Sequence, residues 1–430
     1  MGCSASKSDS EAQVRTDGLE SLLDGLFAGL VEQKPGSMYL PSVQVYARIG
    51  DAWEYSKAFG VMDPFAEQPR AVTIDTPYAI RSTGKLWMAV LAAALRDDGL
   101  VEFDTPCYEL IPEFDRTFAV TSSGEEIDGK SITLLHCLTE SNGFGYLGRI
   151  AYYADEQGVD YDQHAGSLLE WVQLMIARGK LGKPPGTMDY GGGATVLGAL
   201  LEQAHAKAHP DDANGLEALL NERVADKMGA KVRFILRGQD VSVLPALVHV
   251  ENEDGSTRRE GETLAPAEYL LQGKSLVPQG GNGMSTTMAS YGRLMRMLGN
   301  GGVCVETGAR VLTAASAEEV LRGKHLRDTD ATFSCGLHKF HKPKADVQTD
   351  DRMGGGTGTT RGLLPKNGAE LTERFTAGLS CWAGYYGTNQ YYWHEIDAHL
   401  AMSTALDPGP AAREALAEVA DKFNKHILSG

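Results

Sequence analysis

The stretch YAIRSTGKLWMAVLAAAL, at residues 78–95, decides how this chain is interpreted. Ser82 and Lys85 are three positions apart, so on a helix they lie on one face, with the lysine amine within reach of the serine oxygen. Residues 86–95 are apolar almost all round, which is typical of a helix buried in a core. Lys85 would then be the one charge in an apolar helix, the setting in which a lysine can serve as a general base.

The Ser-x-x-Lys spacing is weak evidence when it stands alone. Ser4 and Lys7 repeat it in a polar segment that has no core to support a site. A solvated helix lysine is the alternative interpretation of Lys85, and the spacing does not decide between the two. The decision therefore depends on sequence farther along the chain.

Composition excludes several classes of protein. The chain has 430 residues, of which 42% are hydrophobic and 23% charged, values of a globular protein rather than a disordered or coiled-coil one. A net charge of −17 argues against a nucleic-acid partner, because a phosphate backbone would be repelled. A small molecule is the expected ligand.

The expected location is the cytoplasm. The longest apolar run, residues 86–95, is about half of what a helix needs to cross a bilayer, and residues 1–17 contain no signal-peptide core. The six cysteines are scattered without a Cys-x-x-Cys spacing, so we expect free thiols in a reducing compartment.

Periodicity predicts a sheet built from both ends of the chain, around a mainly helical insertion. Helical spacing is found at residues 10–33, 82–95, 167–178, 195–208 and 411–428. Strand-like runs are found at residues 41–49, 52–61, 335–340, 379–386 and 398–405. Residues 346–375 have the composition of a long loop, and loops of that length are usually functional or mobile.

Further motifs follow Ser82 in a fixed order. They are PPGTMDYGG at residues 184–192, GGNGMSTT at residues 280–287 and LGNGG at residues 298–302. Smaller matches are SNGF at residues 141–144 and LGAL at residues 197–200. Together they resemble the serine β-lactamase-related family, which includes class C β-lactamases, penicillin-binding D,D-peptidases and family VIII carboxylesterases.

The resemblance implies an α/β (α+β) fold, an antiparallel sheet with helices on both faces and the site between sheet and insertion. The expected divisions are a disordered N-terminus at 1–18, one domain at 19–405 and a C-terminal helix at 406–430 that packs on the sheet. Within the domain, the sheet part is expected at about 19–105 and 275–405, and the helical insertion at about 106–274.

The resemblance also assigns roles by position. Ser82 resembles the acylated nucleophile and Lys85 its proton partner. Tyr190 matches the tyrosine of the family's Tyr-x-Asn motif, which carries a proton between serine, lysine and leaving group. Gly192 stands where that motif has asparagine, so the chain lacks the amide that holds the side chain of a β-lactam.

The family's third motif, Lys-Thr-Gly or His-x-Gly, is best matched by Trp382, Ala383 and Gly384 on a late strand, followed by Tyr385. This arrangement resembles the esterase branch, in which Trp-Gly-Gly replaces the cationic form. The alternative match is the GGGTG run at residues 354–358, which lies in loop-like sequence.

If the Trp382 match holds, the backbone N–H groups of Ser82 and Tyr385 form the oxyanion hole. An indole cannot pair with the carboxylate that β-lactam drugs carry. Trp382, Tyr385 and Tyr146 are therefore expected to line an apolar acyl or alcohol pocket. Packing of these aromatic residues in the core is the alternative interpretation.

The expected activity is that of a carboxylesterase-like serine hydrolase, which forms an acyl-enzyme on Ser82 from a small ester or amide. One alternative is a β-lactamase or D,D-peptidase activity. Another is a catalytically inactive, lipid-anchored scaffold or binding protein. No metal or cofactor is expected, because the chain has no His-Glu-x-x-His, P-loop or dinucleotide-binding motif.

The first residues, MGCSASK, match the N-myristoylation pattern with Gly2 as the acceptor. Cys3 beside it is placed for palmitoylation, and two acyl chains are needed for stable membrane attachment. The sequence therefore predicts attachment to the cytosolic face of a membrane through Gly2 and Cys3.

Overall fold

The structure is a computed structural model of the chain. It describes residues 15–32, 40–145, 165–212, 214–236, 238–245, 248–250, 257–259, 277–281, 283–323, 331–340, 379–384, 387–407 and 410–428.

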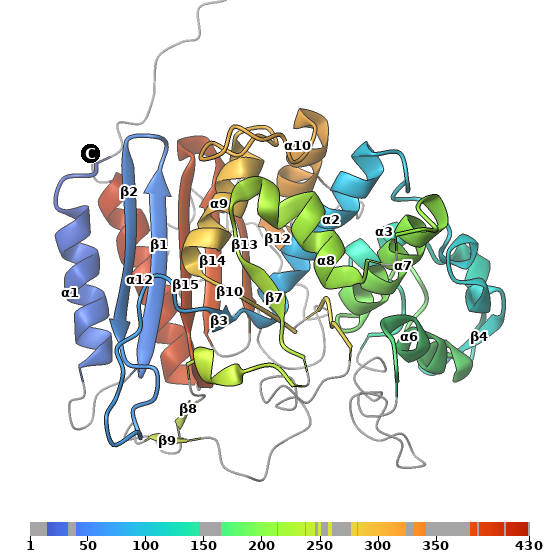
Figure 1. Ribbon diagram of the computed structural model, residues 1–430, viewed down its shortest axis with the longest axis horizontal. Coiled ribbons are helices and arrows are strands. Elements are labelled where there is room, and N and C mark those ends of the chain that lie inside the picture. Colours follow the sequence, from blue (N-terminus) through green and yellow to red (C-terminus); the bar gives the residue numbers. More distant parts are fainter. Residues whose placement is uncertain are drawn as a thin grey trace, which may run out of the picture.

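The main sheet joins the two ends of the chain, as the periodicity predicted (Figure 1). Among the described residues, seven strands form it in the order β11-β12-β13-β14-β15-β1-β2, and every neighbouring pair is antiparallel. These strands are β1 (Ser42–Ile49), β2 (Trp53–Gly60), β11 (Ala331–Ser334), β12 (Leu337–Phe340), β13 (Leu379–Gly384), β14 (Thr388–Trp393) and β15 (Ala398–Thr404).

Two terminal helices, α1 (Leu19–Val31) and α12 (Pro410–Leu428), pack on one face of this sheet (Figure 1). The contact is aromatic, because the ring of Phe423 lies 5.5 Å from that of Trp393 and 6.4 Å from that of Trp53. Phe423 of α12 therefore packs on aromatic residues of β2 and β14.

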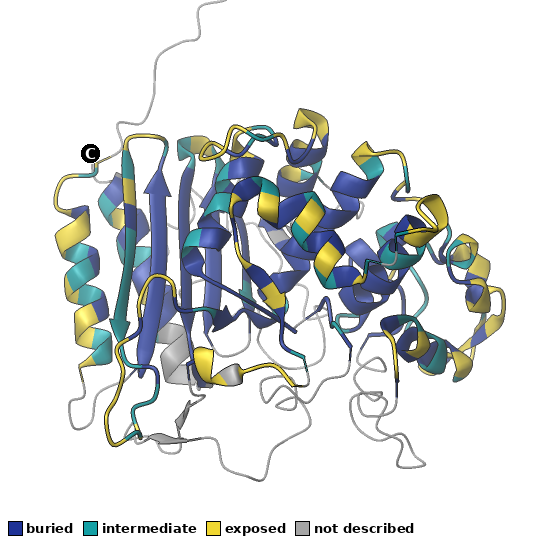
Figure 2. Cartoon of the chain, viewed as in Figure 1, coloured by how far each residue is buried: buried dark blue, intermediate teal, exposed yellow. Residues whose placement is uncertain are grey.

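The opposite face is covered by α9 (Met288–Gly299), with α2 (Gly84–Asp97) and α10 (Ala314–Arg322) beside it. Here α9 approaches the sheet so closely that a Cβ atom at Gly292 would lie 2.3 Å from the ring of Tyr46. Helices on both faces leave β1 buried along its whole length, and Figure 2 shows the buried strands between exposed outer helix faces.

The residues between α2 and α9 are mainly helical, but they also contain short strands. The helices are α3 (Leu134–Leu138), α6 (Leu168–Ala177), α7 (Gly193–Ala208) and α8 (Leu216–Leu220). The strands there are β4 (Thr117–Val120), β5 (Glu126–Asp128), β6 (Lys180–Leu181), β7 (Val232–Phe234), β8 (Val248–Val250), β9 (Thr257–Arg259) and β10 (Met284–Thr286). Two more short strands lie outside that range, β3 (Tyr78–Ala79) before α2 and β16 (Leu406–Asp407) after β15.

The described short strands form three-stranded sheets, and one of these sheets positions the candidate site. It has the order β3-β10-β7, so β7 pairs with β10, and β10 pairs with β3 just before Ser82. Strand β7, at residues 232–234, is therefore linked through β10 to the strand before Ser82, although it lies within the region expected to be a helical insertion.

Several predicted boundaries shift in the structure. The helix expected at residues 10–33 is α1, which begins only after Gly18, whose φ of 76° is left-handed. The strand expected at residues 335–340 begins at Leu337, because Cys335 and Gly336 form a turn with positive φ. None of the described helices is long and apolar enough to cross a membrane.

Candidate active site

Ser82 lies in a tight turn directly before α2, in a single turn of 3₁₀-helix at Arg81–Thr83. The helix was expected to begin at Ser82, and its α-helical part begins two residues later. Arg81 has a φ of 50°, the left-handed region that a bulky residue rarely adopts. Ser82 is partly exposed between the buried Arg81 and Thr83, so the turn presents the serine and buries its neighbours.

Neighbouring groups fix this turn on both sides. The Ile80 N–H donates to the carbonyl of Met284, and the Thr83 hydroxyl donates to the Ile80 carbonyl at 2.7 Å. From α9, the hydroxyl of Tyr291 donates to the carbonyl of Thr83 at 3.1 Å. A strained conformation of this kind persists only where its surroundings determine it.

Lys85 lies in the first turn of α2 and is 4% exposed. Its Nζ donates to the carbonyl oxygen of Gly281 at 2.9 Å and lies 4.6 Å from the centre of the Tyr190 ring. The second contact has the geometry of a cation–π interaction. The structure thus brings together two of the predicted residues, Lys85 and Tyr190, which are 105 positions apart in the chain.

Tyr190 lies in the loop that leads into α7, and Trp382 lies on β13. Their rings are 5.4 Å apart at an angle of 51°. Trp382 is 4% exposed and Tyr190 is partly buried. Trp382 belongs to the buried core, and Tyr190 lies between it and Lys85.

The strand that carries Trp382 packs directly against the serine turn. A Cβ atom at Gly384 would lie 2.4 Å from the carbonyl oxygen of Ile80 and 3.2 Å from Cβ of Arg81. Only glycine allows the backbone of β13 to come this close. Trp382, Ala383 and Gly384 therefore lie on a strand beside Ser82, where the sequence placed its third motif.

Gly192 precedes α7, and its N–H donates to the carbonyl of Gly145 at 3.1 Å. Other predicted residues lie outside the described part of the chain. These are Tyr146, Tyr385, the whole loop at 346–375 with the alternative run at 354–358, and the acylation sites Gly2 and Cys3.

Glu140 is a site residue that the sequence did not indicate. It is 1% exposed, and one oxygen of its carboxylate accepts the N–H groups of Gly191 and Gly193 at 2.8 and 3.3 Å. The one available signal was its position directly before the SNGF match, because a charged residue inside a buried turn needs a partner.

Asp189 is a second carboxylate in the Tyr190 loop. Burial raises its pKa and so does the nearby Glu140, whereas Lys183, 3.9 Å away, lowers it. Within the described residues, no group of three or more His, Cys, Asp or Glu side chains is arranged to hold a metal ion.

Comparison with known proteins agrees with this arrangement. The sequence model of the beta-lactamase family matches residues 27–424. The chain belongs to the beta-lactamase family. No curated protein matches it, so the remaining comparison of this beta-lactamase-family chain is with solved structures.

Solved structures share the fold of this family member at low sequence identity. EstCE1, a hydrolase with promiscuous acyltransferase activity, is 17% identical with a TM-score of 0.67, over 96% of this chain and 98% of that one. Simvastatin synthase (LovD) from Aspergillus terreus, in its unliganded selenomethionyl form, is 15% identical with a TM-score of 0.67, over 96% and 99%.

A penicillin-binding protein homologue from Pyrococcus abyssi has the same fold at 15% identity and a TM-score of 0.59. That match covers 95% of this chain and 78% of the other. The fold is therefore the β-lactamase and transpeptidase fold that the motif order implied.

Proposed function

We propose that this chain is a carboxylesterase-like serine hydrolase that acts through an acyl-enzyme on Ser82. The observation that carries the proposal is the position of Lys85, which is buried one helical turn from Ser82 and in contact with the ring of Tyr190. A serine at a strained turn, an amine behind it and a tyrosine beside the amine are the parts that acyl transfer requires.

In the proposed reaction, the Ser82 oxygen bonds to the carbonyl carbon of an ester while its proton passes to the Lys85 amine. The ester C–O bond then breaks, and the leaving alcohol takes that proton by way of the Tyr190 hydroxyl. Water adds to the acyl-enzyme, releases the carboxylic acid and restores the Ser82 hydroxyl.

The proposed substrate is a neutral ester rather than a β-lactam. Trp382 stands where a cation would pair with a substrate carboxylate, and an indole N–H carries no charge. Its ring packs against the partly exposed Tyr190, an apolar setting that supports binding of an acyl or alcohol group. A net charge of −17 further disfavours anionic substrates at long range.

A comparison of two substrates tests this proposal. Hydrolysis of p-nitrophenyl butyrate and of a chromogenic cephalosporin would be measured with wild type, Ser82→Ala and Trp382→Lys. We expect ester turnover to exceed cephalosporin turnover in wild type, Ser82→Ala to abolish both, and Trp382→Lys to shift the ratio toward the anionic cephalosporin.

Two outcomes would replace the proposal. Cephalosporin turnover above ester turnover in the wild type would favour a β-lactamase or D,D-peptidase activity. Absence of turnover, together with absence of Ser82 labelling by a fluorophosphonate, would favour the catalytically inactive binding protein.

A further inference from the structure

Glu140 follows α3 and is almost completely buried, although it is charged. Its backbone has a φ of 51°, a left-handed conformation that is unfavourable for a residue with a long side chain. A buried carboxylate on a strained backbone is retained only where its contacts compensate for it. Its N–H donates to the carbonyl of Cys137 at 3.3 Å, whereas its carboxylate and its main-chain oxygen contact the loop before α7 and the start of that helix.

That loop is the one that carries Tyr190, and Glu140 holds it on both sides of the tyrosine. The main-chain oxygen of Glu140 accepts the Asp189 N–H at 2.7 Å, and its Oε2 accepts the Gly191 N–H at 2.8 Å. The residues directly before and after Tyr190 are therefore bound to the same buried residue.

The same carboxylate caps helix α7. Gly192 precedes the helix and has no side chain with which to cap it, whereas Oε2 of Glu140 accepts the N–H of the first helical residue, Gly193, at 3.3 Å. A negative charge at this end is favoured by the helix dipole. A Cβ atom at Gly193 would lie 3.1 Å from the Glu140 carboxyl group and 2.7 Å from the carbonyl oxygen of Cys137, so glycine is required for this approach.

We propose that Glu140 is the positioning residue that sets the Tyr190 hydroxyl relative to Ser82 and Lys85. The inference rests on the proposed function, because it gives Tyr190 a proton to carry. Glu140 does not touch the reacting atoms. It acts through the backbone on either side of Tyr190, in a chain whose Tyr-x-Asn motif has become Tyr-Gly-Gly.

The test is a double-mutant cycle on the rate at which a fluorophosphonate labels Ser82. In this reaction a Ser82 oxygen–phosphorus bond forms, the phosphorus–fluorine bond breaks, and the serine proton leaves with fluoride. The variants are Glu140→Gln, Tyr190→Phe and the combination of both. Glutamine keeps the size and one acceptor oxygen of the side chain and removes its charge.

We expect Glu140→Gln to lower the maximal labelling rate about 10- to 100-fold, the scale of a small misplacement of a reacting group. The probe concentration at half-maximal rate should stay the same. In the Tyr190→Phe background, adding Glu140→Gln should lower the labelling rate by less than about 2-fold, since the hydroxyl that Glu140 positions is gone. Gly193→Ala should resemble Glu140→Gln, and Glu140→Ala should be slower still.

Glu202→Gln is the matched control. Glu202 lies on α7, and its carboxylate accepts the backbone N–H of Leu216, which is not part of the Tyr190 loop. Its replacement should lower the melting temperature and leave the labelling rate within about 2-fold of wild type. Melting curves of every variant separate loss of fold from loss of rate.

Each outcome has one interpretation. The role of Glu140 is overturned if Glu140→Gln leaves the labelling rate unchanged, or lowers it by the same factor with and without the Tyr190 hydroxyl. Either result leaves the proposed function intact. Absence of labelling in the wild type overturns the proposed function itself.

Discussion

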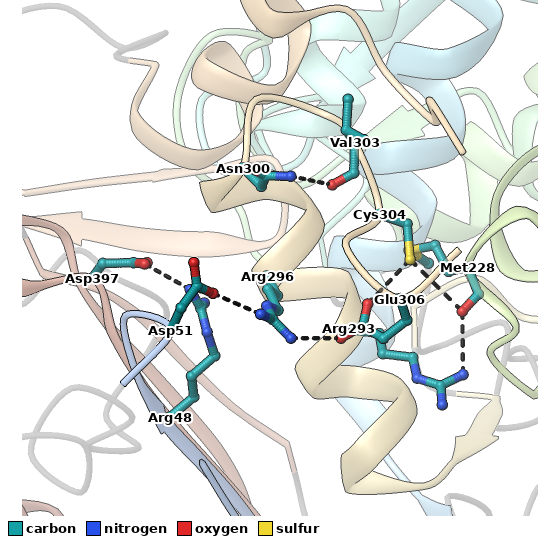
Figure 3. A network of polar contacts seen from close by, with 10 residues as sticks. All are labelled: Arg48, Asp51, Met228, Arg293, Arg296, Asn300, Val303, Cys304, Glu306 and Asp397. Carbon is teal, nitrogen blue, oxygen red and sulfur yellow. Dashed lines mark hydrogen bonds and ion pairs between the residues drawn. The ribbon is translucent and has the colours of Figure 1, made fainter. Parts of the chain in front are cut away.

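Arg48 and Lys85 are both buried cations, and the molecule surrounds them differently. Nη2 of Arg48 lies 2.7 Å from the carboxylate of Asp397 and 3.9 Å from that of Asp51. Asp51 also pairs with Arg296 at 2.6 Å, and Arg296 continues to Glu306 at 3.1 Å (Figure 3). Arg48 and Arg296, at this end of the sheet, therefore each meet two carboxylates.

Lys85 instead meets a carbonyl oxygen and an aromatic ring. Among the residues that the structure describes, no carboxylate lies within ion-pair distance of its Nζ. A carboxylate partner holds a cation in its charged form, whereas a carbonyl and a ring orient the amine without pairing it with a negative charge. The difference separates a cation held in an ion-pair network from an amine held beside the candidate nucleophile.

The largest expected effect is that of Lys85→Met. The variant keeps the length of the side chain and removes the amine, so ester hydrolysis and Ser82 labelling should fall by about 10³-fold, within the range for loss of a general base. Its stability to urea should not fall, because an apolar side chain replaces a buried charge that has no carboxylate partner. Retained activity in this variant would remove Lys85 from the mechanism.

Arg48→Met should lower stability and leave activity unchanged. It removes the cation beside Asp397, to which the Tyr392 hydroxyl still donates at 2.6 Å. We expect a loss of about 1–3 kcal/mol in the free energy of unfolding, less than for a fully buried pair because Asp397 is 42% exposed at its side chain. The rate of Ser82 labelling should be unchanged. A variant that keeps its stability and loses its labelling would contradict the division between the two regions.

His399→Gln should change how stability depends on pH. His399 faces Arg48 across the β1–β15 pair, is fully buried, and has no hydrogen-bond partner for either ring nitrogen among the described residues. Burial, and then the charge of Arg48, lower its pKa to about 3.

The direction follows from proton uptake. Below about pH 6.5 the unfolded chain binds a proton at this histidine and the folded chain does not, so the contribution of His399 to stability should fall by about 1.4 kcal/mol per pH unit down to about pH 3. His399→Gln should lose that part of the slope, whatever its own stability at pH 7. Urea titrations at several pH values measure the unfolding free energy of both proteins. An equal dependence of that free energy on pH in wild type and His399→Gln would be incompatible with a neutral buried His399.

Much of the candidate site could be predicted because each part lies in a local pattern. Ser82 and Lys85 share one helical turn, Tyr190 follows a Pro-Gly loop, and Trp382 lies on a strand-like run. What the sequence could not provide is the contact between these parts. The 4.6 Å between Lys85 Nζ and the Tyr190 ring, and the 5.4 Å between Tyr190 and Trp382, depend on how distant elements pack.

Two features escaped the sequence for physical reasons. Strand β14 reads TNQYYW and is buried on both faces, so it lacks the alternation of a half-exposed strand. Glu140 has no local pattern, because its carboxylate acts on backbone groups about 50 residues away. Both depend on tertiary contacts rather than on spacing along the chain.

The most direct test is to locate the acyl group itself. The protein would be mixed with a short-chain p-nitrophenyl ester and quenched in acid, and the acylated peptide would be mapped by mass spectrometry in wild type and Ser82→Ala. The account predicts one acyl group per chain, on Ser82, and none in Ser82→Ala. An acyl group on another residue, or one that persists in Ser82→Ala, would contradict it.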